Sequence, residues 1–301
     1  MAWFQLFKRN NAQKPSAAVS GKFIQLAGRT YSSEVPYVLP KDDTEISRLD
    51  FQHFMLRYVR KGNYEAPMLH PHDIFDIGCG SGRWAMEMAI QFPMAHVVGV
   101  DIVEPNVEAI AFGNGLSHKP DNYVFVRSNI LEGLTFADNS FDYVHVSLLY
   151  SAIPAVKYPE IMQEIWRIMT PGGWFEWVEG GVEQGGAPAM DLFRQWTIEG
   201  GAKFGLDMQV GLKMGDMLRA AGFSNIRANE FPIPIGAYGG RIGEMMQTNL
   251  YLIYNAGKGM SVKSGVASLE AYNTALQNWP AEVNTVQSVF RYYSVIGQKL
   301  V

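Results

Sequence analysis

The sequence predicts an α/β fold organised around a doubly wound sheet, and two neighbouring stretches carry that prediction. Residues 73–88, DIFDIGCGSGRWAMEM, give a short apolar run, three glycines at alternate positions and then apolar residues at helical spacing. Residues 96–101, HVVGVD, form a second apolar run that ends in an aspartate. A strand, a glycine turn, a helix and a further strand make the first unit of such a sheet, whose ligands bind beyond the carboxyl ends of the strands.

The glycine turn at Gly78–Gly82 restricts the class of ligand. The residue three positions after Gly80 is Arg83, so the G-x-G-x-x-G pattern of dinucleotide-binding proteins fails here. Asp76 precedes the first glycine, where its carboxylate would repel a pyrophosphate but suit a cationic amine. Asp101, at the end of the next strand, is placed to bind a ribose. An adenosine that carries an ammonium group and no phosphate satisfies both carboxylates, and S-adenosylmethionine is such a molecule.

Further strands and one helix are expected after this unit, in the alternating order of a doubly wound sheet. The expected elements are strands at 122–126, 140–147 and 174–181 and a helix at 159–169. Ahead of the unit, Asp42 followed by Glu45 is typical of a helix cap. We therefore expect a helix that runs from this cap to about Lys61.

The last third of the chain is predicted to be mainly helical. A glycine-rich stretch at 180–186 reads as a hinge, and Pro232 and Pro234 are expected to end a strand. The expected elements are helices at 189–203, 212–221, 243–256 and 268–279, a strand at 225–231 and a closing antiparallel strand at 290–300. Residues 232–285 would then be an insertion before the last strand. We interpret its methionine and aromatic faces as ordinary core, and the alternative is a lid that lines a bulky apolar pocket.

The composition of the 301-residue chain is that of a globular protein, with 48% hydrophobic and 18% charged residues. A net charge of −4 gives no indication of a surface that binds nucleic acid or an anionic membrane. No apolar run approaches the roughly 20 residues of a membrane span, and MAWFQLFKRN does not have the form of a signal peptide. The single cysteine, Cys79, excludes an intrachain disulfide and is interpreted as a buried filler. These observations favour a cytoplasmic location.

The N-terminal arm is too apolar for an idle tail, since Trp3, Phe4, Leu6 and Phe7 follow one another closely. It would pack either on its own body or on a neighbouring subunit. Residues 10–20 are polar and could form the hinge for an exchange between subunits. The sequence therefore leaves a homo-oligomer formed through the arm as one of two hypotheses.

Four motifs occur in a fixed order along the chain, GCGSG, VVGVD, SFDYVHV and TPGGWFEWVE. In them the chain resembles the class I S-adenosylmethionine-dependent methyltransferases. It is more closely similar to the fungal secondary-metabolism methyltransferases and their bacterial natural-product relatives, through residues 37–54, 66–101, 131–145 and 171–181. The resemblance covers residues 31–191 well and the last third weakly.

This resemblance implies a Rossmann-like, seven-stranded sheet with helical additions. The expected organisation is an N-terminal arm and helical cover at 1–62, a cofactor-binding core at 63–187, and lid helices with the closing strands at 188–301. The expected cofactor is S-adenosylmethionine, which becomes S-adenosylhomocysteine. Asp76 and the glycine turn would hold its methionine part, and Asp101 its ribose. Ile102, Asn129 and Ile130 would contact its adenine. The candidate cofactor-binding residues are Tyr31, Asp76, Gly78, Cys79, Gly80, Gly82, Arg83, Trp84, Asp101, Ile102, Asn129, Ile130 and Ser147.

Asn129 departs from the family pattern, because related enzymes usually carry an acidic residue there to contact the adenine amino group. An amide still accepts that hydrogen bond through its carbonyl oxygen. The segment after the fourth strand reads SLLYSAIP, without the Asn/Asp-Pro-Pro-aromatic turn of enzymes that methylate nucleobases or glutamine amides. The paired glutamates of arginine methyltransferases are also missing. Both absences argue against N-methylation of macromolecules.

The methyl acceptor is expected to be a hydrophobic small molecule. Its methylation on oxygen or carbon would need a residue that takes its proton. His53, His145 and Glu179 are the candidate catalytic residues for an O- or C-methylation. No group of residues stands out as a metal site, so metal-assisted methylation is not expected. Two alternatives stay open: a cofactor-binding regulatory protein that acts in a complex, and a protein methyltransferase.

Overall fold

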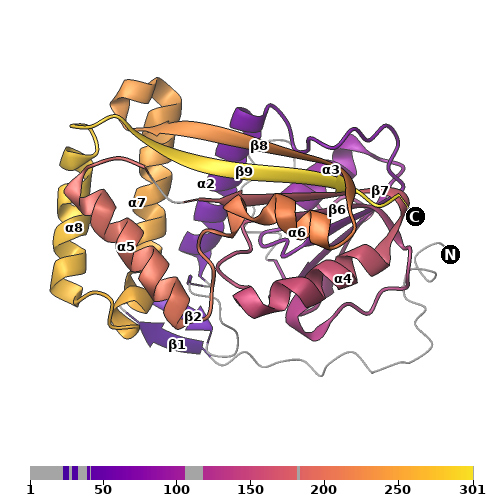
Figure 1. The fold of residues 1–301 in the computed structure, drawn as a ribbon, viewed down its shortest axis with the longest axis horizontal. Coiled ribbons are helices and arrows are strands. Elements are labelled where there is room, and N and C mark those ends of the chain that lie inside the picture. Colours follow the sequence, from indigo (N-terminus) through magenta and orange to yellow (C-terminus); the bar gives the residue numbers. More distant parts are fainter. Residues whose placement is uncertain are drawn as a thin grey trace.

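A seven-stranded mixed sheet forms the centre of the molecule in the computed structural model (Figure 1). Its strands are β3 (Asp73–Ile77), β4 (His96–Asp101), β5 (Tyr123–Arg127), β6 (Phe141–Ser147), β7 (Met169–Gly180), β8 (Ser224–Ile235) and β9 (Ser288–Gln298). They lie in the order β5-β4-β3-β6-β7-β9-β8, and β9 is antiparallel to both of its neighbours while the other pairs are parallel. The predicted doubly wound, seven-stranded sheet is confirmed.

The structure describes residues 23–26, 29–32, 39–40, 42–105, 118–181 and 184–300. The N-terminal arm at 1–20, for which the sequence predicts packing on the body or on a second subunit, lies outside the described residues. The first described elements form a two-stranded antiparallel sheet of β1 (Phe23–Leu26) and β2 (Arg29–Ser32).

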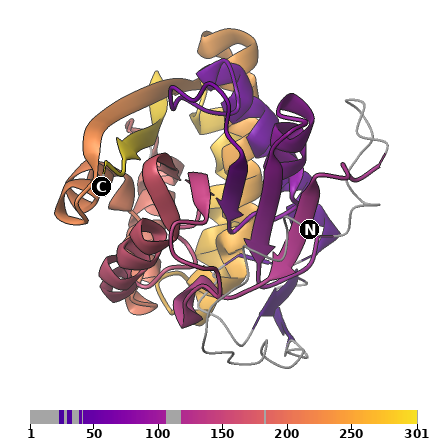
Figure 2. The ribbon, with the colours of Figure 1, turned by 90° about the vertical axis from the view of Figure 1, so that its right-hand side faces the viewer.

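Helices cover both faces of the seven-stranded sheet, as Figures 1 and 2 show. The covering helices are α3 (Arg83–Gln91) on one face and α4 (Tyr158–Ile168) and α6 (Met214–Ala220) on the other. Because both faces are covered, β3 and β4 are buried and largely apolar along most of their length. Polar side chains on these strands are therefore exceptions, and two of them, Asp76 and Asp101, lie towards the carboxyl ends.

The turn between β3 and α3 needs glycine because three of its residues take the left-handed conformation. Gly78, Gly80 and Gly82 have φ angles of +70°, +56° and +76°. A Cβ on Gly78 would lie 2.7 Å from Cδ1 of Leu149, which is too close for two carbon atoms. The amide of Gly78 donates to the carbonyl of Val100 at 2.8 Å, which fixes the turn to the end of β4.

Helix α2 (Asp43–Arg60) begins and ends where the cap signals predict. The Asp42 side chain accepts a hydrogen bond from the backbone amide three residues on, and Lys61 ends the helix in the left-handed conformation. In the middle of the helix, Asp50 Oδ1 accepts a hydrogen bond from the Ser81 hydroxyl at 2.7 Å. This contact holds α2 over the glycine turn.

One predicted boundary is wrong, and it lies at Pro232 and Pro234. The sequence predicts that these prolines end a strand, but β8 continues through both of them to Ile235. Strand β8 is at the edge of the sheet and pairs only with β9. On an edge strand every second N–H points away from the sheet, so a proline there removes no hydrogen bond of the ladder. The inserted segment therefore begins only after Ile235.

The helices after β7 form a separate group, at the left in Figure 1, where β8 and β9 extend beyond the other strands. These helices are α5 (Pro188–Lys203), α7 (Gly240–Lys263) and α8 (Leu269–Glu282). Aromatic rings fill their core: Phe193 stacks on Tyr254 at 4.1 Å between centroids, and Trp196 stacks on Tyr272 at 5.0 Å. Trp279 is fully buried beside them. The interpretation of these faces as core is confirmed, because the rings pack against one another.

Within the described ranges, no helix has both the length and the hydropathy needed to cross a membrane. The same residues contain no group of three or more histidine, cysteine, aspartate or glutamate side chains arranged to hold a metal ion.

Candidate functional site

A cavity of about 310 Å³ lies between α2 and the carboxyl ends of β3, β4 and β6. The predicted residues that line it are His53, Asp76, Gly78, Cys79, Gly80, Arg83, Trp84, Asp101, Ile102, Asn129, Ile130, His145 and Ser147. Gly82, Tyr31 and Glu179 are not among its lining residues. Segments far apart in the sequence meet here because the carboxyl ends of parallel strands share one edge of a sheet.

The glycine turn presents bare backbone to this cavity at Gly80. A Cβ built on Gly80 has one neighbour within 4 Å, Cδ1 of Leu49 at 3.7 Å. The adjacent Cys79 side chain is buried, and burial raises the pKa of its thiol well above the ordinary value. The turn therefore leaves room for a ligand against its main chain and offers no reactive thiolate.

Asp101 ends β4 with its carboxylate held in a fixed orientation. Its Oδ2 accepts a hydrogen bond from the amide of Gly80 at 3.1 Å, and its Oδ1 accepts one from the amide of Val103 at 3.1 Å. Each carboxylate oxygen has a second lone-pair site, so neighbouring hydroxyl groups of a ligand can still donate to it. The geometry suits a pair of vicinal hydroxyls such as those of a ribose.

Asp76 and His145 form a buried pair on neighbouring strands. Asp76 Oδ1 lies 2.8 Å from His145 Nδ1, and the Trp84 ring stacks on the imidazole at 3.8 Å between centroids. Burial raises the pKa of Asp76 well above its ordinary value and lowers the pKa of His145 to about 3. Charge on either group is thus disfavoured unless a counter-charge arrives. A ligand cation beside Asp76 would supply it and favour the carboxylate.

The side of the cavity beyond β4 and β5 is mainly apolar. Ile102 and Ile130 line it and provide flat packing for a planar ring. Asn129 lines it too, but its amide already caps a short 3₁₀ turn: Oδ1 accepts from the amide of Leu131 at 3.1 Å, and Nδ2 donates to Glu132 at 2.9 Å. The amide that the sequence assigns to a ligand therefore has a structural partner as well.

Helix α2 brings Arg57 to the cavity beside His53, and the sequence predicts no role for Arg57 in the site. Glu87 on α3 accepts three contacts at one oxygen, from His53 Nε2 at 3.1 Å, Arg57 Nη1 at 3.0 Å and Asn63 Nδ2 at 3.1 Å. Although burial acts to raise it, these contacts hold the pKa of Glu87 below its ordinary value. The sequence contains a signal for this polar face of α2, because His53, Arg57 and Asp50, which binds the glycine turn, lie on one side of the predicted helix.

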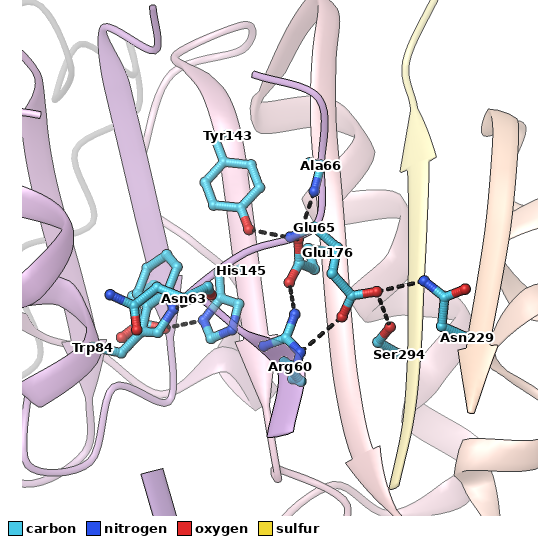
Figure 3. A network of polar contacts seen from close by, with 11 residues as sticks. Arg60, Asn63, Glu65, Ala66, Trp84, Tyr143, His145, Glu176, Asn229 and Ser294 are labelled. Carbon is cyan, nitrogen blue, oxygen red and sulfur yellow. Dashed lines mark hydrogen bonds and ion pairs between the residues drawn. The ribbon is translucent and has the colours of Figure 1, made fainter. Parts of the chain in front are cut away.

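Figure 3 shows a polar network that fixes the end of α2 to the sheet. Arg60 pairs with Glu176 on β7 and, through Nε at 2.7 Å, with Glu65. Glu176 is fully buried and also accepts from the Tyr143 hydroxyl at 3.0 Å and from the amides of Glu65 and Ala66. Burial acts to lower the pKa of Arg60, but the two carboxylates raise it above its ordinary value. The network therefore holds an ionised arginine, and Arg60 in turn forms part of the cavity wall.

Of the three predicted site residues that do not line the cavity, Gly82 belongs to the glycine turn, whereas Tyr31 and Glu179 are held elsewhere. Tyr31 donates its hydroxyl hydrogen to the carbonyl of Ala256 at 2.7 Å, which fixes β2 to α7, and burial raises its pKa to about 12. Glu179 is fully buried at the end of β7. Its Oε1 accepts from the Trp177 indole at 2.8 Å and from the amide of Leu149 at 3.0 Å. Since Leu149 does line the cavity, Glu179 reaches the site only through the loop that it holds.

Buried Glu179 gives the first testable prediction. Burial is the main cause that raises the pKa of Glu179 to about 8, whereas an exposed glutamate in the unfolded chain titrates near 4.5. Its stabilising contribution is complete below about pH 4.5 and is lost as the pH rises towards about 8, because only the unfolded state then releases the proton. The loss approaches about 1.4 kcal/mol per pH unit within this window.

Glu179→Gln should abolish that slope, because the amide stays neutral at every pH. Urea denaturation of both proteins at several pH values between about 5 and 8 gives their free energies of unfolding, and the difference between the two proteins measures the pH dependence due to Glu179. The free energy of unfolding of the variant should increase relative to that of the wild type as the pH rises. A constant difference across the window would contradict the raised pKa.

The fold and this cavity define a Rossmann-like protein that binds an adenosine-type ligand at the first β-α turn of its sheet. Residues 74–173 match a family model described as a methyltransferase domain. In the structural comparison, phosphoethanolamine N-methyltransferase 2 of Haemonchus contortus with bound S-adenosyl-L-methionine gives a TM-score of 0.52 at 18% identity. The alignment covers 85% of this chain and 57% of that one, and it supports the fold alone.

Similar proteins are found among fungal enzymes and regulators. The N-methyltransferase sirN of Leptosphaeria maculans is 26% identical over 88% of this chain and 95% of that protein. The secondary metabolism regulator LAE1 of Cochliobolus heterostrophus is 27% identical over 67% of each chain. The regulator laeA of Aspergillus fumigatus is 33% identical over 50% of this chain, and the chain spans 39% of that protein.

Taken together, the motifs, the fold and these relatives identify the chain as a class I S-adenosylmethionine-dependent methyltransferase related to the fungal secondary-metabolism branch. Its cofactor is S-adenosylmethionine.

Proposed function

We propose that this methyltransferase acts on a hydrophobic small molecule of secondary metabolism. The observation that carries the proposal is the apolar part of the cavity lining that the glycine turn and the strand ends do not supply. Its apolar lining comes from α2 and from the connection after β6, and consists of Ile46, Leu49, Leu56, Leu148, Leu149 and Ala152. A cavity of about 310 Å³ with such walls has the size and character of a small-molecule site. The aromatic rings of α5, α7 and α8 do not line it, so the apolar walls come from these aliphatic side chains.

The residues on the other side of the cavity fit the cofactor, and we assign them accordingly. Asp76 would accept from its ammonium group, the bare backbone at Gly80 would lie against its methionine part, and Asp101 would accept from its ribose hydroxyls. Ile102 and Ile130 would pack on its adenine. When bound, S-adenosylmethionine supplies a methyl group on a sulfonium that is already activated for transfer. The chain therefore mainly has to align the two molecules and exclude water.

The two histidines of the site receive different roles in this proposal. His145 is 2% exposed and bonded to Asp76, so we assign it to positioning that carboxylate. His53 lines the cavity, and its Nε2 contacts Glu87 at 3.1 Å, which would orient the imidazole ring. His53 is therefore the residue we propose to take the proton that an acceptor hydroxyl loses. Glu179 supports the cavity wall through Leu149.

Turnover is the direct test. Titration calorimetry with S-adenosylhomocysteine measures cofactor-site binding, and incubation with S-adenosylmethionine and an extract of hydrophobic metabolites is followed by mass spectrometry. We expect micromolar binding and one metabolite that gains the mass of a methyl group. Fragmentation of that product then locates the methyl on oxygen or carbon, or on nitrogen, the atom that the name of sirN specifies for that relative. Binding without any methylated product would contradict the proposal.

A regulatory function is the second candidate, because two of the relatives carry the name of secondary metabolism regulators. A regulator of this kind would bind the cofactor and act in a complex with other proteins. Cofactor binding is common to both functions, so it does not separate them. Methylation of a small molecule by the isolated chain separates them, and its absence would favour the regulator.

A further inference from the structure

One stripe of α2 faces the cavity at helical spacing and alternates between polar and apolar side chains. Glu45, Leu49, Gln52 and Leu56 all line the cavity. Leu49 places this stripe beside the glycine turn, because its Cδ1 is the nearest neighbour of a Cβ built on Gly80. Glu45 lies one helical turn further towards the start of the helix. The stripe therefore belongs to the wall beside the turn.

Gln52 on this stripe has partners at both ends of its amide. Its Oε1 accepts from Arg48 Nη1 at 2.8 Å, and its Nε2 donates to the hydroxyl of Tyr292 at 3.0 Å. The Tyr292 hydroxyl also accepts from Asn249 Nδ2 on α7 at 3.1 Å. Gln52 is thus part of a chain of hydrogen bonds that joins α2 to β9 and α7.

Glu45 differs from Gln52 because half of its carboxylate has no partner. Both contacting nitrogens of Arg48, Nε at 3.0 Å and Nη2 at 2.6 Å, bond to the same oxygen, Oε1. Glu45 is only 3% exposed, and its Oε2 has no hydrogen-bond partner among the described residues. Leaving a buried carboxylate oxygen without a donor is unfavourable. Because Glu45 is a lining residue of the cavity, this buried oxygen is suited to accept a hydrogen bond from a ligand donor that reaches it.

The positive charges around the cavity are already neutralised. Its three lining arginines each pair with a carboxylate, in the pairs Arg57–Glu87, Arg60–Glu176 and Arg83–Asp50. Among the described residues of the wall, an anionic ligand would thus meet no arginine without a carboxylate partner. Glu45 is paired in the same way with Arg48, and its second oxygen can only accept, so this wall favours hydrogen-bond donors over anions.

We infer that Glu45 is a specificity-determining residue that accepts a hydrogen bond from an O–H or N–H group of an otherwise apolar methyl acceptor. The inference rests on the proposed function, because it concerns the acceptor side of the same cavity. It restricts the acceptor class to hydroxyl- or N–H-bearing apolar molecules and disfavours carboxylates.

Matched probes test this inference with Glu45→Gln. The variant keeps an oxygen for Arg48 and presents an NH₂ group, a donor, in place of Oε2. The probes are indole against 1-methylindole, and 2-naphthol against 2-methoxynaphthalene and 2-naphthoate, titrated by calorimetry with S-adenosylhomocysteine at saturation. Glu164→Gln is the control, since Glu164 forms the same kind of i,i+3 pair with Arg167 and does not line the cavity.

For the wild type we expect indole and 2-naphthol to bind at least about 10-fold more tightly than their methylated analogues and 2-naphthoate. Glu45→Gln should remove this preference by weakening the donor probes alone, with the affinity for S-adenosylhomocysteine unchanged. Glu164→Gln should behave as the wild type. Lack of the preference in the wild type, its persistence in Glu45→Gln, or no binding of either donor probe overturns the inference. Failure of the proposed function shows separately, as wild-type protein that binds S-adenosylhomocysteine but methylates no metabolite of the extract.

Discussion

Replacement of Asp101 by alanine is expected to raise the dissociation constant for S-adenosylhomocysteine by about 10–100-fold. The proposed site loses one or two charge-assisted hydrogen bonds to the ribose, worth about 1.5–3 kcal/mol in total. Asp101 also holds the amides of Gly80 and Val103, so the variant loosens the turn on which the cofactor would lie. Both effects act in the same direction. Titration calorimetry measures the change directly.

Two further variants make this measurement decisive. Asp101→Asn keeps the size of the side chain and one oxygen acceptor, so its loss of affinity should be smaller. Asp216→Ala removes an aspartate that is 86% exposed and distant from the cavity lining, and it should leave the affinity unchanged. An affinity of Asp101→Ala within about twofold of the wild type would remove Asp101 from the site.

Replacement of Arg60 by methionine is expected to lower the free energy of unfolding by about 3–5 kcal/mol. The change removes the cation that lies between two carboxylates, those of Glu176 and Glu65. Glu176 is fully buried, and a buried carboxylate without its cation is the strongly unfavourable case. Urea denaturation, with the midpoint and slope compared between variants, measures the loss.

Adding Glu176→Gln to Arg60→Met should recover part of the lost stability, because the amide removes the unpaired charge but keeps acceptors for Tyr143 and the backbone. Arg219→Met is the matched control. Arg219 pairs with Asp216 on the surface at 67% and 86% exposure, and such pairs contribute little. If Arg60→Met and Arg219→Met lost similar amounts of stability, the buried network would not have the importance assigned to it.

The cofactor-binding part of the fold could be predicted from the sequence, because the features that define it are local. Three glycines at alternate positions are needed where the backbone takes positive φ, and that requirement is written in a single short stretch. The aspartate at the end of β4 follows from the same unit. By contrast, Pro232 and Pro234 misled the prediction, because whether a proline ends a strand depends on the strand's place in the sheet.

The candidate catalytic residues also show which features are local in the sequence and which depend on the tertiary structure. His53, His145 and Glu179 are all compatible with proton transfer by residue type, but the structure gives them different surroundings. Glu179 is enclosed behind Leu149, His145 is bonded to Asp76, and His53 lines the cavity. Burial and pairing of this kind depend on residues thirty or more positions away along the chain, so no local pattern contains them.

The sequence alone therefore determined the fold class, the order of the motifs, the cofactor and the capped helix before the core. These depend on hydrophobic periodicity, glycine conformation and cap residues, which act over a few neighbouring positions. Only the tertiary structure decided that the aromatic helices pack on themselves and that α2 supplies a wall of the cavity beside the glycine turn. It also left one oxygen of Glu45 without a partner among the described residues. These outcomes depend on which distant side chains come to share a buried space, and that space exists only once the sheet, α2 and the helical group have packed together.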